Sequence, residues 1–143
     1  MKISLDKKVA LVTGGATGIG KGIAKALSDS GAIVIITSRD SRNIRNTLKI
    51  LSKKCFGYNL DVSKSKNLEI LYKKIKKKFK NVDILVNNIG HTLNIKDPFA
   101  KIDNWKKVMD LNFFTTVEVT NRFIKDMNRK NWGRIINITS IAG

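Results

Sequence analysis

The sequence has few residues that cross-link or interrupt a chain. A single cysteine, Cys55, leaves no possibility of an internal disulfide or of a cysteine-based zinc site within one chain. One proline is atypical of a disordered linker, and a hydrophobic fraction of 42% suffices for a packed core. No segment approaches the roughly 20 apolar residues that span a bilayer, and the N-terminus shows no secretory signal. We therefore predict one soluble, cytoplasmic domain without a membrane partner.

Acidic residues are also scarce. The chain has 11 of them against 28 lysines and arginines, which gives a net charge of +17. Such a charge can attract nucleic acid or an anionic membrane surface. The lysines are spread along the chain, however, and in the densest run (residues 73–80) they alternate with Ile75 and Phe79 at helical spacing. This pattern, with abundant isoleucine and asparagine, indicates a solvated helix face and an AT-rich genome, so we expect no nucleic-acid partner.

Apolar runs alternate with amphipathic stretches along the chain. Five of these runs predict strands, at residues 9–12, 32–37, 55–60, 82–86 and 134–139. Strands separated by helices require right-handed crossovers and helices on both faces of a parallel sheet. The predicted fold is therefore α/β, a doubly wound parallel sheet of the Rossmann type. It occupies one domain over residues 1–143 and stops after the fifth strand.

The helices between these strands are predicted from apolar spacing and capping residues. In the first helix the apolar set is Ile19, Ile23, Ala26 and Leu27, and Gly31 stands where a left-handed cap is expected. The other predicted helices are one around residues 44–51, one over 63–79 with Ser63 as N-cap, and one over about 103–128 with a break near Asp110.

A glycine-rich turn, TGGATGIG over residues 13–20, joins the first predicted strand to the first helix. Glycines let the backbone approach a pyrophosphate, and the helix N-terminus presents unpaired N–H groups to the anion. The spacing is G-x-x-x-G-x-G and not the commoner G-x-G-x-x-G. The position between strand and helix favours dinucleotide binding over an ordinary turn. The candidate cofactor-binding residues here are Gly14, Ala16, Thr17, Gly18, Ile19 and Gly20.

This turn and four later motifs resemble the short-chain dehydrogenase/reductase family over essentially the whole chain. The four motifs are Asp61-Val62, NNIG at 87–90 (isoleucine replaces the family's alanine), DLN at 110–112 and GRIINITS at 133–140. The resemblance implies adenine contacts from Asp61 and Val62, and cofactor contacts from Asn88 and Gly90. It implies catalytic roles for Asn112 and for Ser140, which would orient the substrate carbonyl. Taken singly, Asp61 could be a turn residue or a helix cap, Asn88 could satisfy backbone groups at a strand end, and Asn112 could be a surface helix residue.

The end of the second predicted strand bears on cofactor choice. An acidic residue there would bind the ribose hydroxyls of NAD and repel a 2′-phosphate. Ser38 stands where NAD-dependent relatives usually carry aspartate, Arg39 follows it, and the next carboxylate is Asp40. The planar fork of arginine donors suits a phosphate, although Arg39 could also be an exposed residue near a helix start. We predict that Ser38 and Arg39 select NADP(H), with NAD as the less favoured cofactor.

The resemblance implies hydride transfer between the nicotinamide and a carbonyl or alcohol substrate, with a Tyr-x-x-x-Lys pair after the serine. Only three residues follow Ser140. Tyr72 and Lys76 have this spacing but fall on the third predicted helix, on an outer layer. The chain is thus expected to lack the pair and to be inactive alone. His91, the single histidine, has no role in the family pattern and stays unassigned.

Several functions stay open at this stage. The first is an NADP(H)-dependent oxidoreductase similar to 3-oxoacyl carrier-protein reductases or to sugar-metabolising relatives. The second is a truncated remnant that binds the dinucleotide without catalysis, and the third, suggested by charge alone, is a nucleic-acid-binding module. The full-length form is expected to be a homo-oligomer. We also expect exposed apolar surface on the fifth strand and the long helix, and hence aggregation of the isolated chain.

Overall fold

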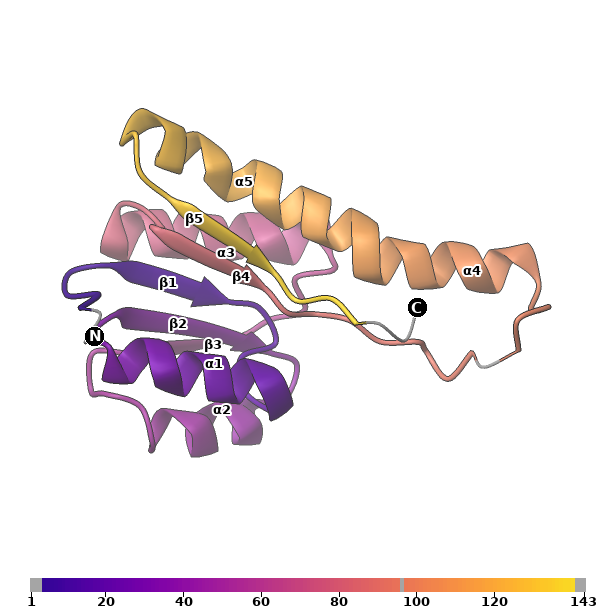
Figure 1. Cartoon of the computed structure of the whole chain (residues 1–143), viewed down its shortest axis with the longest axis horizontal. Helices are drawn as coiled ribbons and strands as arrows, with labels where there is room; N and C mark the ends of the chain where they lie inside the picture. The colour runs from indigo at the N-terminus through magenta and orange to yellow at the C-terminus, as the bar shows by residue number, and fades with distance from the viewer. Residues whose placement is uncertain (1–3, 96, 141–143) are drawn as a thin grey trace.

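A computed structural model describes residues 4–95 and 97–140 of the chain, so the outermost residues of the predicted domain lie outside the described part. Within those ranges, five parallel strands form one sheet in the order β3-β2-β1-β4-β5 (Figure 1). This confirms the predicted doubly wound sheet. The strands are β1 (Val9–Val12), β2 (Ile33–Ser38), β3 (Phe56–Asn59), β4 (Ile84–Asn87) and β5 (Arg134–Asn137), each within one or two residues of its predicted ends.

Helices cover both faces of the sheet. Figure 1 shows α1 (Gly18–Asp29) and α2 (Ser41–Leu48) on one face and α3 (Ser65–Phe79) and α5 (Thr115–Arg129) on the other. α4 (Ile102–Met109) continues into α5 through the π-helical turn η1 (Asp110–Phe114), which is the break predicted near Asp110. Insertions of this kind in a helix are frequent at functional sites.

The three central strands β2, β1 and β4 are buried on both faces, whereas the edge strands β3 and β5 are more exposed. In β1, Leu11 packs in a core with Leu71 of α3 and Phe123 of α5, and all three side chains are fully buried. Val12 packs on the opposite face with Ala24 of α1 and Ile44 of α2. Alternate residues of one strand thus serve two cores, because successive side chains of a strand point to opposite faces.

Two details of the predicted helices are wrong. α3 begins at Ser65, and the Ser63 hydroxyl and backbone N–H both donate to the Asp61 carboxylate instead of capping the helix. In α1, Ile19 is 68% exposed, while the buried positions include Gly20 and Ala24. The first turn of the helix lies so close to the segments after β1 and β4 that a Cβ at position 20 would meet them. Of the predicted apolar set, Ile23 and Leu27 pack against the core, whereas Ile19 and Ala26 are exposed.

Other expectations are confirmed. Gly31 has φ +96°, the left-handed conformation predicted after α1. On η1, Phe113 and Phe114 are 52% and 56% exposed, and Ile136 on β5 is 44% exposed, as expected for these elements. Among the described residues, no helix combines the length and apolar character that crossing a bilayer requires.

Candidate functional site

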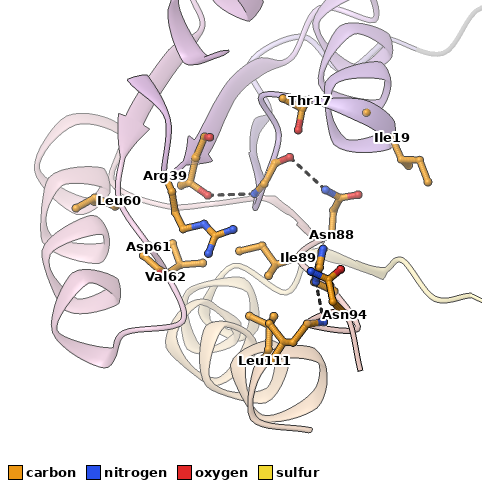
Figure 2. Close-up of a pocket in the computed structure, with 17 residues that line it drawn as sticks. Thr17, Ile19, Arg39, Leu60, Asp61, Val62, Asn88, Ile89, Asn94 and Leu111 are labelled. Carbon is orange, nitrogen blue, oxygen red and sulfur yellow. Dashed lines mark hydrogen bonds between the residues drawn. The ribbon is translucent and has the colours of Figure 1, made fainter. Parts of the chain in front are cut away.

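A cavity of about 730 Å³ opens at the carboxyl edge of the sheet (Figure 2). The segments that follow β1, β2, β3 and β4 line it, together with Leu111 of η1. The chain crosses from β1 to β2 on one side and reaches β4 on the other, so this is where the strand order reverses. Open α/β sheets bind ligands in the crevice at such a point. The volume falls within the roughly 300–1,000 Å³ typical of small-molecule sites.

Most of the predicted cofactor-binding residues line this cavity. Ala16 and Gly20 are exceptions, because both are buried behind its wall. Sequence reasoning missed several lining residues whose types carry no signal of their own. The predicted residues that line the cavity are Gly14, Thr17, Gly18, Ile19, Ser38, Arg39, Asp61, Val62, Asn88 and Gly90, and the missed ones are Thr37, Leu60, Ile89, His91, Leu93, Asn94 and Leu111.

Glycine is required in the turn after β1 for two different reasons. Gly14 and Gly18 have φ values of +62° and +51°, which residues with a Cβ rarely adopt. Gly20 is required by space, since a Cβ there would lie 2.5 Å from both the Gly14 carbonyl oxygen and Asn88 Nδ2. The first turn of α1 therefore packs directly against the segments that follow β1 and β4.

Hydrogen bonds tie this turn to its neighbouring strands. The Thr13 hydroxyl donates to the Val86 carbonyl at 3.3 Å and accepts from the Asn88 N–H at 3.0 Å. Asn88 Nδ2 donates to the carbonyl oxygens of Thr13 (3.1 Å) and Gly14 (3.3 Å). The Asn88 side chain thus satisfies backbone groups at the strand ends, as the alternative interpretation of this residue required. It also lines the cavity. Ala16 is held from behind, because Thr47 Oγ1 of α2 donates to its carbonyl at 2.8 Å.

The N-terminus of α1 is available to an anion. Thr17 is the N-cap, and within the described part of the chain its side chain makes no capping hydrogen bond to the helix. The first backbone N–H groups of a helix have no intrahelical partner and carry the positive end of the helix dipole. Because Thr17, Gly18 and Ile19 line the cavity, these donors fit a phosphate group there.

Arg39 extends into the cavity from the end of β2 (Figure 2). Its guanidinium has no hydrogen-bond or ion-pair partner among residues 4–95 and 97–140. The carboxylate of Asp40 faces away, because it caps α2 by accepting from the N–H groups of Arg42 (2.7 Å) and Asn43 (3.4 Å). The Arg42 hydrogen bond, above all, lowers the pKa of Asp40 below its usual value. At the end of β2 the cavity is therefore lined by the positively charged Arg39 side chain, and the Asp40 carboxylate is not part of the lining.

The part of the cavity beyond Arg39 is largely apolar. Leu60, Ile89 and Leu111 line it, and Val62 contributes a side chain with no exposed surface. Asp61 lies at the same place, but its Oδ1 accepts from both the N–H (3.1 Å) and the hydroxyl (2.7 Å) of Ser63. Asp61 is therefore a turn-forming residue as well as a lining residue. Apolar walls with a few polar groups suit a flat heteroaromatic ring.

The two predicted catalytic residues do not line the cavity. The Asn112 carboxamide on η1 brackets the backbone of His91, with Oδ1 accepting from its N–H and Nδ2 donating to its carbonyl, both at 2.9 Å. A Cβ on Gly90 would lie 2.8 Å from Asn112 Oδ1, so a larger residue there would displace this carboxamide. Ser140 is exposed beyond the end of β5. The structure places Asn112 behind the cavity wall formed by His91, and Ser140 is outside the lining.

Tyr72 and Lys76 lie in the outer helix layer, as predicted. Both lie on α3, where the Tyr72 ring packs edge-on against Phe123 and Lys76 Nζ lies 3.0 Å from the carboxylate of Asp126. The lysine-rich run of α3 faces solvent around the buried Ile75. These contacts join α3 to α5 and leave both residues outside the cavity lining.

Curated proteins with known names are similar to this chain. A 3-oxoacyl-[acyl-carrier-protein] reductase FabG of Haemophilus influenzae is 37% identical over 139 residues, which cover 97% of this chain and 57% of that protein. A 2-dehydro-3-deoxy-D-gluconate 5-dehydrogenase of Pseudoalteromonas atlantica is 37% identical over 144 residues, covering 98% and 57%. The chain therefore spans between half and two thirds of the length of these relatives.

Solved structures share the fold across nearly all of the chain. A 7α-hydroxysteroid dehydrogenase complexed with NADH and 7-oxo glycochenodeoxycholic acid matches with a TM-score of 0.90 at 27% identity, over 99% of this chain and 56% of that one. The Pseudomonas aeruginosa RhlG/NADP active-site complex matches with a TM-score of 0.87 at 33% identity, over 99% and 57%. The short chain dehydrogenase family model matches residues 8–143. The chain belongs to the short-chain dehydrogenase family.

Proposed function

We propose that this chain is the dinucleotide-binding part of an NADP(H)-dependent oxidoreductase acting on a carbonyl or alcohol substrate. Membership of the family and the cavity at the strand-order reversal support the proposal. Bound NADP(H) would supply or accept the hydride at its nicotinamide ring. The residues of this chain would bind and orient that cofactor.

The cavity fits a dinucleotide at three places. The open N-terminus of α1 at Gly18 would hold the pyrophosphate, and the missing Cβ of Gly18, which would meet no heavy atom within 4 Å, would let it approach the backbone. The apolar wall with Leu60 and Leu111, backed by the buried Val62, would hold the adenine. Arg39 would hold a phosphate on the adenosine ribose.

The proposed preference for NADP(H) over NAD(H) depends on one observation: the Arg39 guanidinium lies in the cavity without a partner among the described residues, and the neighbouring Asp40 carboxylate is engaged in capping α2. A charge-assisted hydrogen bond is worth about 1.5–3 kcal/mol, which corresponds to roughly 10- to 100-fold in affinity. We expect Arg39→Leu to weaken NADPH binding by about that factor and to leave NADH binding nearly unchanged. Titration of the purified protein with each nucleotide, followed by fluorescence or calorimetry, measures both constants.

A matched control is available on α2. Arg45 lies one helix turn beyond the cap, outside the cavity lining, and donates to the Ser41 hydroxyl at 3.3 Å. Arg45→Leu removes the same charge and should change NADPH affinity by less than about twofold, because exposed charges at a distance are screened by salt. Equal losses in the two variants would mean that net charge, and not the position of Arg39, attracts the cofactor.

The substrate class is proposed from the relatives. Their names point to 3-oxoacyl thioesters or to sugar-derived ketones. Asn112 and Ser140 are proposed to support the chemistry, Asn112 by holding the segment at His91 and Ser140 by orienting the carbonyl. Oxidation of NADPH in the presence of a short 3-oxoacyl thioester, compared with a keto-sugar acid, tests this. Tight NADPH binding without turnover of either class would restrict the function to cofactor binding.

Assembly and location complete the proposal. We propose that the complete enzyme is a cytoplasmic homo-oligomer with no nucleic-acid partner. The apolar surface that includes Trp105, Met109 and Phe113 would supply a contact between subunits. Light scattering of the purified protein tests the assembly. A strictly monomeric protein that remains soluble would contradict it.

A further inference from the structure

His91 makes a contact that the proposed function does not use. It is the only histidine in the sequence, it follows Gly90 directly, and it lines the cavity. Its ring nitrogen Nδ1 accepts a hydrogen bond from the backbone N–H of Leu93 at 2.7 Å. Because Nδ1 is the acceptor, the proton of the neutral ring lies on Nε2. The imidazole therefore forms a hydrogen bond within its own loop while the residue lines the cavity.

The loop that this bond holds is conformationally unusual. Residues 92–95 form a turn closed by the Ile95 N–H, which donates to the Thr92 carbonyl at 3.0 Å. Its two central residues, Leu93 and Asn94, have φ values of +55° and +61°. Asparagine tolerates this left-handed region, but leucine rarely enters it. Such a conformation persists only where the surroundings hold it in place, and it is frequent at ligand sites.

Two bonded contacts link this turn to the rest of the fold. The backbone of His91 is fixed from one side by the Asn112 carboxamide on η1. The imidazole of His91 then accepts the hydrogen bond from the Leu93 N–H and so holds the turn at residues 92–95. Leu93 and Asn94 both line the main cavity, and Leu93 also lines an adjoining cavity of about 530 Å³ with Arg39 and Asp61. The place of the imidazole thus determines where this wall of the cavity lies.

We propose that His91 is a positioning residue for cofactor binding, which acts by holding the left-handed turn at Leu93 and Asn94 against the cavity. The inference rests on the proposed function, since the occupant is NADP(H). His91 preorganises the wall of the site, so the cofactor does not have to order this loop when it binds. Ordering a loop on binding lowers affinity, and preorganisation avoids that loss.

Two variants of His91 separate the hydrogen bond from the ring. His91→Phe keeps a flat ring of similar size and removes the acceptor. His91→Asn supplies a side-chain oxygen that can accept from the N–H two residues on, as in an Asx turn. We expect the phenylalanine variant to bind NADPH about threefold to tenfold more weakly than the wild type, the range for one lost hydrogen bond. The asparagine variant should regain most of this affinity.

Thermal melts distinguish positioning from general damage. His91 is exposed, so both variants should melt within about 2–4 °C of the wild type. Amide hydrogen exchange at Leu93 reports the bond without any ligand, and it should be faster in the phenylalanine variant than in the other two proteins. Unchanged exchange in that variant would show that the ring does not hold the turn, and would overturn the inference.

The binding results also separate this inference from the proposed function. If the wild type binds NADPH and the phenylalanine variant binds it equally well, His91 has no positioning role and the proposed function stands. An asparagine variant as weak as the phenylalanine variant would likewise overturn the role of the acceptor. If the wild type itself does not bind NADPH, the proposed function fails, and the inference fails with it.

Discussion

Two glycines of α1 predict opposite results for the same substitution. Gly20 and Gly22 lie in the same helix, two residues apart. A Cβ on Gly22 would meet no heavy atom within 4 Å, whereas one on Gly20 would lie 2.5 Å from the Gly14 carbonyl oxygen and from Asn88 Nδ2. Replacing each glycine with alanine therefore compares free space with a packed contact against the candidate cofactor site.

The expected magnitudes follow from helix propensity and packing. Alanine in a helix is about 0.5–1 kcal/mol more favourable than glycine, so Gly22→Ala should stabilise the protein by about that amount. Gly20→Ala has the same gain, but its Cβ must move about 0.9 Å to reach the 3.4 Å of ordinary contact. Overpacking costs about 1–3 kcal/mol, and the displaced Asn88 amide risks two hydrogen bonds of about 1 kcal/mol each. If both hydrogen bonds are lost, the net expectation is a loss of about 2–4 kcal/mol.

Urea denaturation of both variants measures these changes, and NADPH titration measures their effect on the site. Gly20→Ala should also weaken NADPH binding by about tenfold or more, because the turn proposed to bind the phosphates must shift. Gly22→Ala should bind like the wild type. Equal stability of the two variants, or stabilisation by Gly20→Ala, would refute the argument that α1 begins in contact with the segment after β4.

Two further predictions concern charged groups away from the cavity. Asp126 is 1% exposed and forms ion pairs with Lys76 and Arg129. Asp126→Asn should therefore lower the free energy of unfolding, measured by urea denaturation, by about 1–3 kcal/mol. An unchanged denaturation midpoint would contradict the role of the Lys76–Asp126 pair in joining α3 to α5. The second concerns Asp40, whose pKa is lowered mainly by the Arg42 N–H. Its capping contribution is therefore present above its ordinary pKa of 3.8 and is lost as the pH falls through the lower folded value. The variant Asp40→Asn keeps a capping oxygen but cannot titrate. The melting temperatures of the wild type and of this variant should depend differently on pH below about pH 4 and in parallel above it. Parallel curves over the whole pH range would contradict the role of the carboxylate.

Much of the fold follows from local patterns in the sequence. Buried parallel strands read as short β-branched runs because both of their faces are covered, and 9–12 matches β1 without error. The glycine turn at 13–20 is recognisable because positive φ and close packing both select for glycine. Arg39 was identified as a candidate phosphate-binding residue because Ser38, which precedes it, stands where NAD-dependent relatives usually carry aspartate. These features depend on residues close together in the chain, so the sequence alone determined the sheet type and the place of the site.

The remaining features depend on contacts between distant segments. Gly20 packs against the Gly14 carbonyl and the Asn88 side chain, a contact that helical periodicity does not predict. Asn112 turns its carboxamide to the backbone of His91, 21 residues earlier, because η1 passes beside the segment after β4. The left-handed turn at Leu93 contradicts the local preference of leucine and is held by a bond from the His91 ring. Only the tertiary structure could decide these points, because each depends on which segments the sheet brings together.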